Sequence, residues 1–200
     1  ALTGMDGNFT PLAEKDFAPR SVRSIISNAK DKAQGPDRFV QEAAASKDWR
    51  MPRIVEIYSG YQRRLREANA LDFDDIILHT VHLLQRDPEV LAHYQSKFRY
   101  VLVDEYQDTN HLQYLLARLL AGGRENICVV GDDDQSIYRF RGANIENILN
   151  FEKEYDACRT IRLEQNYRST QNILDAANAF IRHNTGRKFK TLWTEAGPGE

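Results

Sequence analysis

The side chains with the clearest capacity for chemistry lie in the stretch RYVLVDEYQDTN, residues 99–110. Its short apolar run is rich in β-branched residues, which is typical of a strand covered on both faces in a parallel α/β sheet. Asp104 and Glu105 follow this run directly, and Asp108 comes soon after. Ligands bind at the carboxyl ends of such strands, so these acids are placed to hold a metal or orient water. An acidic turn that only ends the strand and caps the next helix is the simpler alternative.

Two other predicted strands also end in polar residues. GDDDQSIYRFRGA, residues 131–143, follows one of them, and EQNYRS, residues 164–169, follows the other. Because parallel strands end at a common edge, we expect the three segments to converge on one crevice. Such a crevice could position water, stack a base and neutralise phosphate, which indicates phosphoryl transfer. The residues expected there are Asp104, Glu105, Gln135, Tyr167 and Arg168.

Composition sets limits on the class of protein. With 200 residues, 42% hydrophobic and 28% charged, the chain has room for one large or two small globular domains. The net charge of -2 gives no global positive field, so any contact with nucleic acid must come from local groups. Cys128 and Cys158 lack metal-ligand spacing, and we expect buried free thiols in a reducing, cytoplasmic setting. No apolar stretch reaches the roughly 18 residues of a membrane span, so no membrane association is expected.

Helical patterns fill the first half of the chain. A long one, at about residues 52–69, has an apolar face and an arginine-rich face that we expect to be exposed to solvent, with contact to duplex DNA as the alternative. Asp72 is predicted to cap the next helix together with Asp75, and Asp87-Pro88 to begin another. Residues 1–97 are therefore predicted to form an all-α subdomain.

After residue 97 short apolar runs alternate with helical patterns. This alternation is typical of a parallel sheet with right-handed crossovers, so the predicted fold class is α/β, with the sheet domain over residues 98–200. The strands are predicted at residues 100–103, 127–130 and 160–163, and the helices at residues 111–121, 145–151 and 171–183.

The three polar segments resemble motifs of the UvrD/Rep/PcrA-type superfamily-one DNA helicases. VDEYQDTN is similar to motif II, GDDDQSIYRFRGA to motif III and LEQNYRS to motif IV, while LDFDDII, residues 71–77, resembles another family segment. The resemblance implies part of a RecA-like parallel-sheet domain of the P-loop NTPase type, beside a helical accessory subdomain. It also implies ATP-driven 3′ to 5′ movement on single-stranded DNA and unwinding at junctions of single and double strands, in DNA repair or replication.

The same resemblance implies a role for individual residues. Asp104 would coordinate Mg²⁺, and Glu105 would activate the attacking water. Gln135 would sense the γ-phosphate of ATP and couple it to DNA, and Arg168 would contact that phosphate. Tyr167 would stack on the adenine, with core packing as the alternative for this side chain.

The run YRFR, residues 138–141, interleaves aromatic and cationic side chains. By resemblance, Tyr138 and Phe140 would stack on bases of single-stranded DNA, and each stack is typically worth about 1–3 kcal/mol. Relatives often have Trp in place of Phe140, so its stacking would be weaker. Arg139 and Arg141 would bind the DNA backbone or anchor internal carboxylates, and the sequence leaves both open.

Other polar groups are given simpler interpretations. Asp132, Asp133 and Asp134 form a charge run that we expect to be a solvated turn, with Asp132 as a candidate for the outer shell of a metal. His79 and His82 share a helix without a further ligand at metal spacing, so surface placement is expected rather than a zinc site.

The pattern GxxxxGK[ST], whose backbone cradles phosphates, is absent, because none of the 11 glycines is followed by Lys. We therefore expect a fragment that lacks the ATP-binding segment and the second motor domain and is inactive alone. A missing strand would expose sheet edges and apolar faces, so dimerisation, local disorder or rearrangement is expected.

Two alternative functions stay open. One is a metal-dependent phosphoesterase or nuclease built on Asp104, Glu105, Asp108 and Asp132. The other is a non-catalytic helical interaction module within residues 1–97. Neither alternative accounts for all three motifs.

Overall fold

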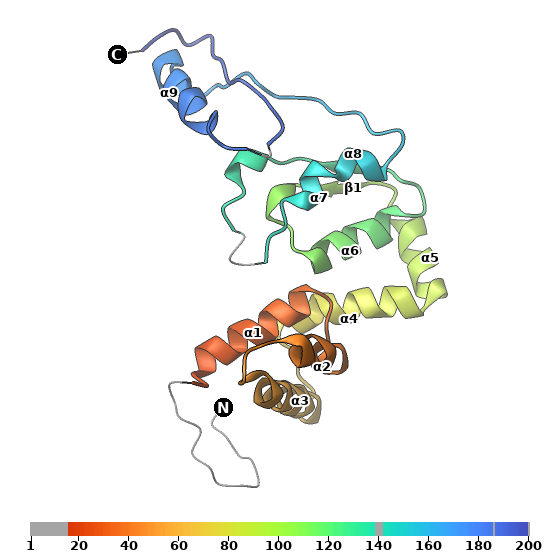
Figure 1. Ribbon diagram of the computed structural model, residues 1–200. Helices are drawn as coiled ribbons and strands as arrows, with labels where there is room; N and C mark the ends of the chain where they lie inside the picture. The colour runs from red at the N-terminus through yellow and green to blue at the C-terminus, as the bar shows by residue number, and fades with distance from the viewer. Residues whose placement is uncertain (1–15, 139–141, 186, 200) are drawn as a thin grey trace. The chain divides into compact units, whose positions relative to one another are not determined.

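The computed structural model describes residues 16–138, 142–185 and 187–199, which are mostly helical (Figure 1). The chain divides into two compact units. Of the described residues, the first comprises residues 16–101, 110–128 and 142, and the second comprises residues 102–109, 129–138, 143–185 and 187–199. Each unit has buried residues of its own.

The first unit contains the helices predicted from the sequence pattern. Several of them begin with Pro in the first turn, where the missing N–H has no intrahelical partner to lose. Asp72 and Asp75 form the predicted capping box, and Asp87 accepts backbone hydrogen bonds at the next helix start. The helices are α1 (Pro19–Asp31), α2 (Pro36–Ala45), α3 (Met51–Glu67), α4 (Phe73–Arg86), α5 (Pro88–Lys97) and α6 (His111–Ala121).

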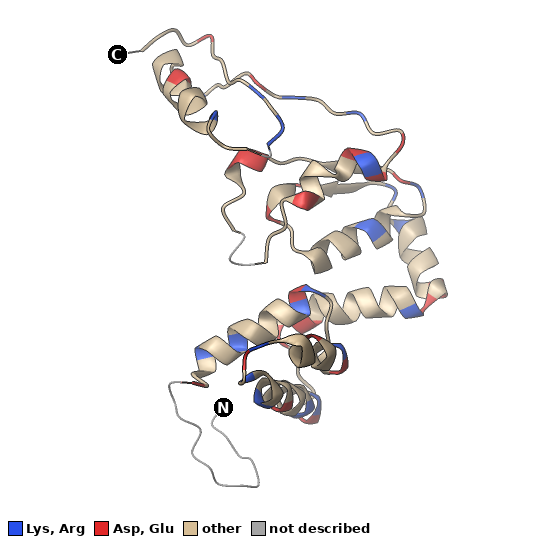
Figure 2. Ribbon diagram, viewed as in Figure 1, with Lys and Arg blue, Asp and Glu red and all other residues tan. Residues whose placement is uncertain are grey.

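Two apolar clusters stabilise this unit. The larger lies between α1, α2 and α3 and includes Ile54 and Tyr58, which are fully buried on the predicted apolar face of α3. The smaller joins α4 and α6 through Leu78, Val81 and Leu112. The opposite face of α3 carries exposed arginines mixed with acidic residues, as predicted (Figure 2).

A buried ammonium group ties α1 to α4. Lys30 has 0% exposure, and its Nζ lies 2.5 Å from Asp72 and 2.8 Å from Asp75. The Tyr61 hydroxyl donates to Asp72 at 2.8 Å, and the Gln62 amide donates to Asp75 at 2.9 Å, so α3 joins the same network. Burial alone would raise the pKa of Asp72, but the hydrogen bonds from Lys30, the Asp75 backbone and Tyr61 hold that pKa below its ordinary value. Acids of the segment LDFDDII therefore have structural partners in this fold.

Strands β1 (Val101–Val103) and β2 (Ile127–Val129) form a parallel two-stranded sheet. Hydrogen bonds from Val101 to Asn126 and from Val130 to Val103 set a register in which Leu102 lies opposite Cys128. Leu102 is 76% exposed and Cys128 is exposed as well, so the predictions of a fully covered strand and a buried thiol at Cys128 are wrong. The apolar run predicted the strand correctly, but burial also requires an element that packs on that face. Both cysteines are free thiols.

The second unit is built from short elements. The Tyr106 ring is buried and packs edge to face on Phe151 at 5.7 Å, and η1 packs against α7. The helix predicted at residues 145–151 is divided into α7 and α8, whereas α9 lies where a helix was predicted. The elements are η1 (Tyr106–Asp108), η2 (Asp133–Gln135), α7 (Glu146–Leu149), α8 (Phe151–Glu154) and α9 (Gln171–Ile181).

The prediction of a strand at residues 160–163 is wrong. Within the described part of the chain this segment has no ladder partner, and Ile161 and Leu163 are 68% and 79% exposed. An isolated parallel bridge joins Gln165 and Trp193 instead. An apolar run becomes a strand only when a neighbouring strand accepts its backbone hydrogen bonds, and no such neighbour is described beside this run.

The α/β class is confirmed, because helices make up most of residues 16–97 and the parallel sheet follows. The boundary near residue 97 stays a prediction. None of the helices in the described ranges combines the length and the apolar character that a bilayer crossing needs.

Replacement of Lys30 by Met is expected to lower the free energy of unfolding by about 3–5 kcal/mol, because Asp72 and Asp75 would keep buried charge without a cation. Urea denaturation followed by circular dichroism measures the effect. Lys32→Met is the matched control, since Lys32 is exposed and pairs at the surface with Glu42 at 2.8 Å; its cost should not exceed about 1 kcal/mol. Equal costs for the two variants would contradict the buried network.

The carboxyl group of Asp31 is partly buried at the end of α1, and its pKa is raised. It accepts a hydrogen bond from the Asn110 side chain at 2.7 Å. Partial burial, and then the charge of Asp74, raise the pKa of Asp31 to about 6. Because the folded-state pKa lies above the ordinary 3.8, the protonated acid favours folding, and this stabilisation is lost as the pH rises from below 3.8 through about 6.

Asp31→Asn is therefore expected to stabilise the chain at pH 7.5 by about 1 kcal/mol, a value reduced for solvent screening because the group is only partly buried. The difference from the unmodified chain should shrink as the pH falls and vanish below pH 3.8, where the acid becomes protonated in the unfolded as well as the folded state. Urea titrations at several pH values measure it. Asp156→Asn, at an exposed position, is the control and should give no such pH-dependent gain.

Candidate functional site

The turn after β1 presents the two acids predicted to act. Asp104 and Glu105 are both exposed, and Asp104 Oδ1 accepts a hydrogen bond from the Glu105 backbone N–H at 2.9 Å. Glu105 adopts the left-handed conformation, with φ of 50° and ψ of 42°. This region is unfavourable for residues other than Gly, and such strain concentrates at functional sites.

Gln107 connects this turn to the segment after β2. Its side chain is buried, with 1% of the residue exposed. Its Nε2 donates to Glu105 Oε2 at 2.8 Å, while its Oε1 accepts from the Asp132 backbone N–H at 3.0 Å. Its main-chain carbonyl accepts from the Ser136 hydroxyl at 3.3 Å. The sequence pattern did not predict a role for Gln107, because an uncharged amide between acids gives no signal until its burial is known.

The close approach of the two segments depends on Gly131. A Cβ atom at this position would lie 2.5 Å from Gln107 Oε1 and 2.9 Å from Ile148 Cδ1. Both distances are shorter than van der Waals contact, so a side chain at this position would displace the amide. The glycine that begins the segment GDDDQ therefore allows Gln107 to reach the backbone of Asp132.

The hydrogen bonds continue to Gln135, whose Nε2 donates to Asp132 Oδ2 at 2.8 Å. A connected series therefore runs from Glu105 through Gln107 and Asp132 to Gln135. The structure brings together the first two of the three segments that were expected to converge.

The third segment is not joined to them by these bonds. Tyr167 is 86% exposed and its hydroxyl donates to Gln165, and the Arg168 backbone N–H donates to Asn166 within the same turn. The core-packing alternative for Tyr167 is therefore wrong. The expected convergence required a third strand in the sheet, and in the described part of the chain residues 160–163 do not pair with β1 or β2.

The predicted DNA-contacting run is described only at its first residue. Tyr138 is 38% exposed. Arg139, Phe140 and Arg141 lie outside the described residues, so the base-stacking and backbone-contacting roles stay predictions.

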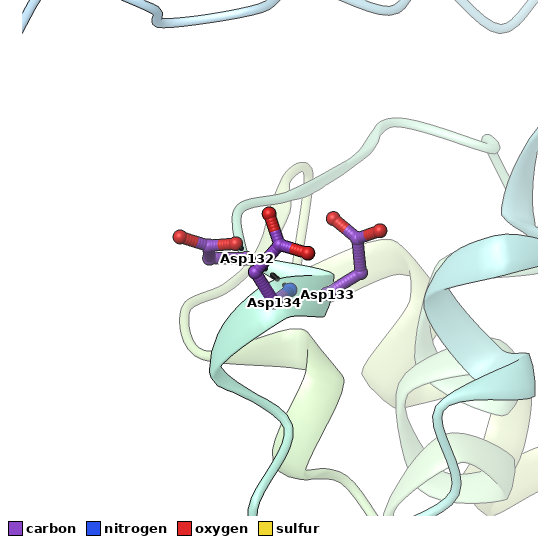
Figure 3. A group of neighbouring side chains, drawn as sticks. All are labelled: Asp132, Asp133 and Asp134. Carbon is purple, nitrogen blue, oxygen red and sulfur yellow. Dashed lines mark hydrogen bonds between the residues drawn. The ribbon is translucent and has the colours of Figure 1, made fainter. Parts of the chain in front are cut away.

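The acidic triad Asp132, Asp133 and Asp134 is not a solvated turn, contrary to the sequence prediction. Figure 3 shows the three carboxylates projecting from η2 and the residue before it. The Lys190 ammonium contacts all three, at 3.4 Å from Asp133 and 3.2 Å from Asp134, and Arg187 lies 2.5 Å from Asp134. The acids are close enough together to hold a cation, and Lys190 supplies one.

Electrostatics at the triad follow from these contacts. Burial raises the pKa of Asp132, but hydrogen bonds from Lys190 and Gln135 outweigh it and lower that pKa. Burial likewise works against the charge of Lys190, and the paired carboxylates raise its pKa. Among the described residues this triad is the one group of three metal-binding side chains, so His79 and His82 belong to no such cluster.

Comparison with known proteins assigns the chain to a family. Residues 4–156 match the UvrD/REP helicase N-terminal domain, and residues 161–200 match the UvrD-like helicase C-terminal domain. The chain belongs to the UvrD/REP helicase family, as its motifs indicated.

Alignments with related helicases cover all or nearly all of the chain. The chain is 51% identical over 206 residues to the ATP-dependent DNA helicase UvrD1 of Mycobacterium bovis, with 100% of the chain covered. It is 52% and 53% identical over 189 residues to the ATP-dependent DNA helicases PcrA of Staphylococcus epidermidis and Staphylococcus aureus, with 94% covered. It spans 27% of the UvrD1 sequence and 26% of the PcrA sequences.

Because of the backbone strain at Glu105, a Gly variant at this position should be more stable than an Ala variant, which is the reverse of the order found inside a helix. Glu105→Gly should be more stable than Glu105→Ala by about 1 kcal/mol, because both variants lose the Gln107 contact and only Gly tolerates the positive φ freely. Urea denaturation measures the difference. At Glu56, an exposed position inside α3, the same pair is the control and should reverse, with Gly less stable by about 0.5–1 kcal/mol. The same order at both positions would contradict the strain.

Proposed function

We propose that this chain is part of an ATP-dependent DNA helicase that moves 3′ to 5′ along single-stranded DNA and opens duplex at junctions. The observation that carries the proposal is the hydrogen-bonded series that joins Glu105 to Gln135 through Gln107 and Asp132. It links the acid proposed for hydrolysis to the amide proposed to sense the γ-phosphate. Family membership supports it, and the UvrD1 and PcrA relatives are named ATP-dependent DNA helicases.

The proposed chemistry uses the two exposed acids of the turn. Asp104 fits a magnesium ligand, because hard cations bind carboxylate oxygens and its Oδ2 is left over when Oδ1 accepts from Glu105. Mg²⁺ bound there would offset negative charge that develops on phosphate oxygens. Glu105 has one carboxylate oxygen held by Gln107, and the other is left to take a proton from the attacking water. The Asp132–Asp134 triad fits a metal poorly, because the cations of Lys190 and Arg187 already pair with its carboxylates.

Nucleotide and DNA contacts complete the proposal. Tyr167 presents an exposed ring that can stack on adenine, and the exposed Arg168 can pair with the γ-phosphate. Tyr138 and Phe140 would stack on successive bases, and Arg139 and Arg141 would meet backbone phosphates or internal acids. These residues lie in the proposed RecA-like part, residues 98–200, and residues 1–97 form the proposed accessory subdomain.

We also propose that these 200 residues alone hydrolyse no ATP, since they contain no GxxxxGK[ST] segment to hold the phosphates. Exposed apolar side chains include Leu102 in β1, and Ile161 and Leu163 in the segment where a further strand was predicted. Self-association through the sheet edge would cover part of this surface in the isolated chain.

In the full-length protein that carries this chain, Glu105→Gln is expected to lower DNA-stimulated ATP turnover by about 10²–10⁴-fold, because the amide cannot accept the proton from water. A coupled assay at saturating DNA measures turnover, and nucleotide binding should change little. Glu67→Gln, the same change at an exposed position of α3, is the matched control. Phosphoester hydrolysis that needs metal but no nucleotide, and that Glu105→Gln abolishes, would support the phosphoesterase alternative instead.

A further inference from the structure

Gln107 is buried beside an exposed acid. Glu105 lies on the surface of a turn, where a long side chain ordinarily samples several rotamers. The Gln107 amide limits that freedom, because its Nε2 lies 2.8 Å from Glu105 Oε2 and its own position is fixed by burial. A carboxylate that must face one water molecule benefits from such restraint, since small displacements of a reacting group reduce rate steeply.

The orientation of the amide follows from its other partner. The Asp132 backbone N–H can only donate, so the atom that faces it at 3.0 Å must be the oxygen of Gln107. The amide nitrogen must then face Glu105, which can only accept when it is ionised. The amide N–H of Gln107 therefore points at the Glu105 carboxylate. This orientation follows from the hydrogen-bonding capacity of the two partners and does not depend on which amide atom is assigned as nitrogen and which as oxygen.

We propose that Gln107 is a positioning residue for the hydrolytic step, and that its amide N–H holds the Glu105 carboxylate in the orientation that accepts the proton from water. The inference rests on the proposed function of Glu105. Its second contact, to the backbone of Asp132, anchors the amide to the segment that carries Gln135, and Gly131 leaves the room that this contact needs.

The test uses the full-length protein with Gln107→Glu and Gln107→Met. Glu keeps the size of the side chain and its acceptor for Asp132 N–H, but it replaces the donor with a like charge beside Glu105. Met keeps the length but offers neither the donor for Glu105 nor the amide oxygen that accepts from the Asp132 N–H. Both variants should lower kcat for ATP by about 10²-fold while KM for ATP changes by less than about threefold.

Ser136→Ala is the structural control, because it removes a different hydrogen bond between the same two segments and leaves the amide in place. It should keep kcat within about threefold of the unmodified protein. The exchange variant Glu105→Gln/Gln107→Glu reverses donor and acceptor. It should recover Tm lost in Gln107→Glu, yet turn over no faster than Glu105→Gln, because no carboxylate is left at position 105.

A second measurement covers variants that fail to fold. In the 200-residue chain, the side-chain amide protons of Gln107 should exchange slowly with solvent by NMR, and Glu105→Ala should make at least one of them exchange faster. Unchanged exchange would overturn the inference. A normal kcat in Gln107→Glu, with a kcat that is lost in Glu105→Gln, would also overturn the inference. That result would leave the proposed function intact. Normal turnover in Glu105→Gln would remove the proposed function and this inference with it.

Discussion

Buried polar groups must be paired, and this constraint organises each of the two units. In the first unit the Lys30 ammonium has no access to water, so its charge is tolerated only because Asp72 and Asp75 both contact it. That requirement fixes how α1 meets the start of α4. In the second unit the Gln107 amide is equally enclosed, and its partners come from the turns after β1 and β2.

The second of these buried groups explains how a surface acid can have a defined geometry. Glu105 is exposed to reach water and phosphate, yet a group in solvent is ordinarily mobile. The neutral amide of Gln107 restrains the carboxylate and leaves its charge in place, whereas a lysine would neutralise that charge. The acids of the triad have a different partner. Lys190 pairs with Asp132, Asp133 and Asp134, so these carboxylates are suited to stabilising the fold rather than to binding a metal.

Much of the fold could be predicted because its signals are local. The Asp72 cap, the start of α5 at Asp87-Pro88 and the apolar face of α3 each depend on residues within a few positions of one another. The prediction of a strand at residues 160–163 was wrong because a strand depends on a distant signal. It needs a partner strand to accept its hydrogen bonds, and its own sequence does not contain that partner. Burial of Leu102 and Cys128 was wrong for the same reason, because an apolar side chain is covered only where another element packs on it.

The sequence by itself determined the family, the helices of the first unit and the acids at the end of β1, because motifs, caps and helical periodicity depend on neighbouring residues. Only the tertiary structure decided which polar groups meet. Lys30 lies 42 residues from Asp72, and Gln107 lies 25 residues from Asp132. Pairing over such separations depends on burial and on how the chain packs, so neither Lys30 nor Gln107 has a recognisable pattern around it until the fold encloses it.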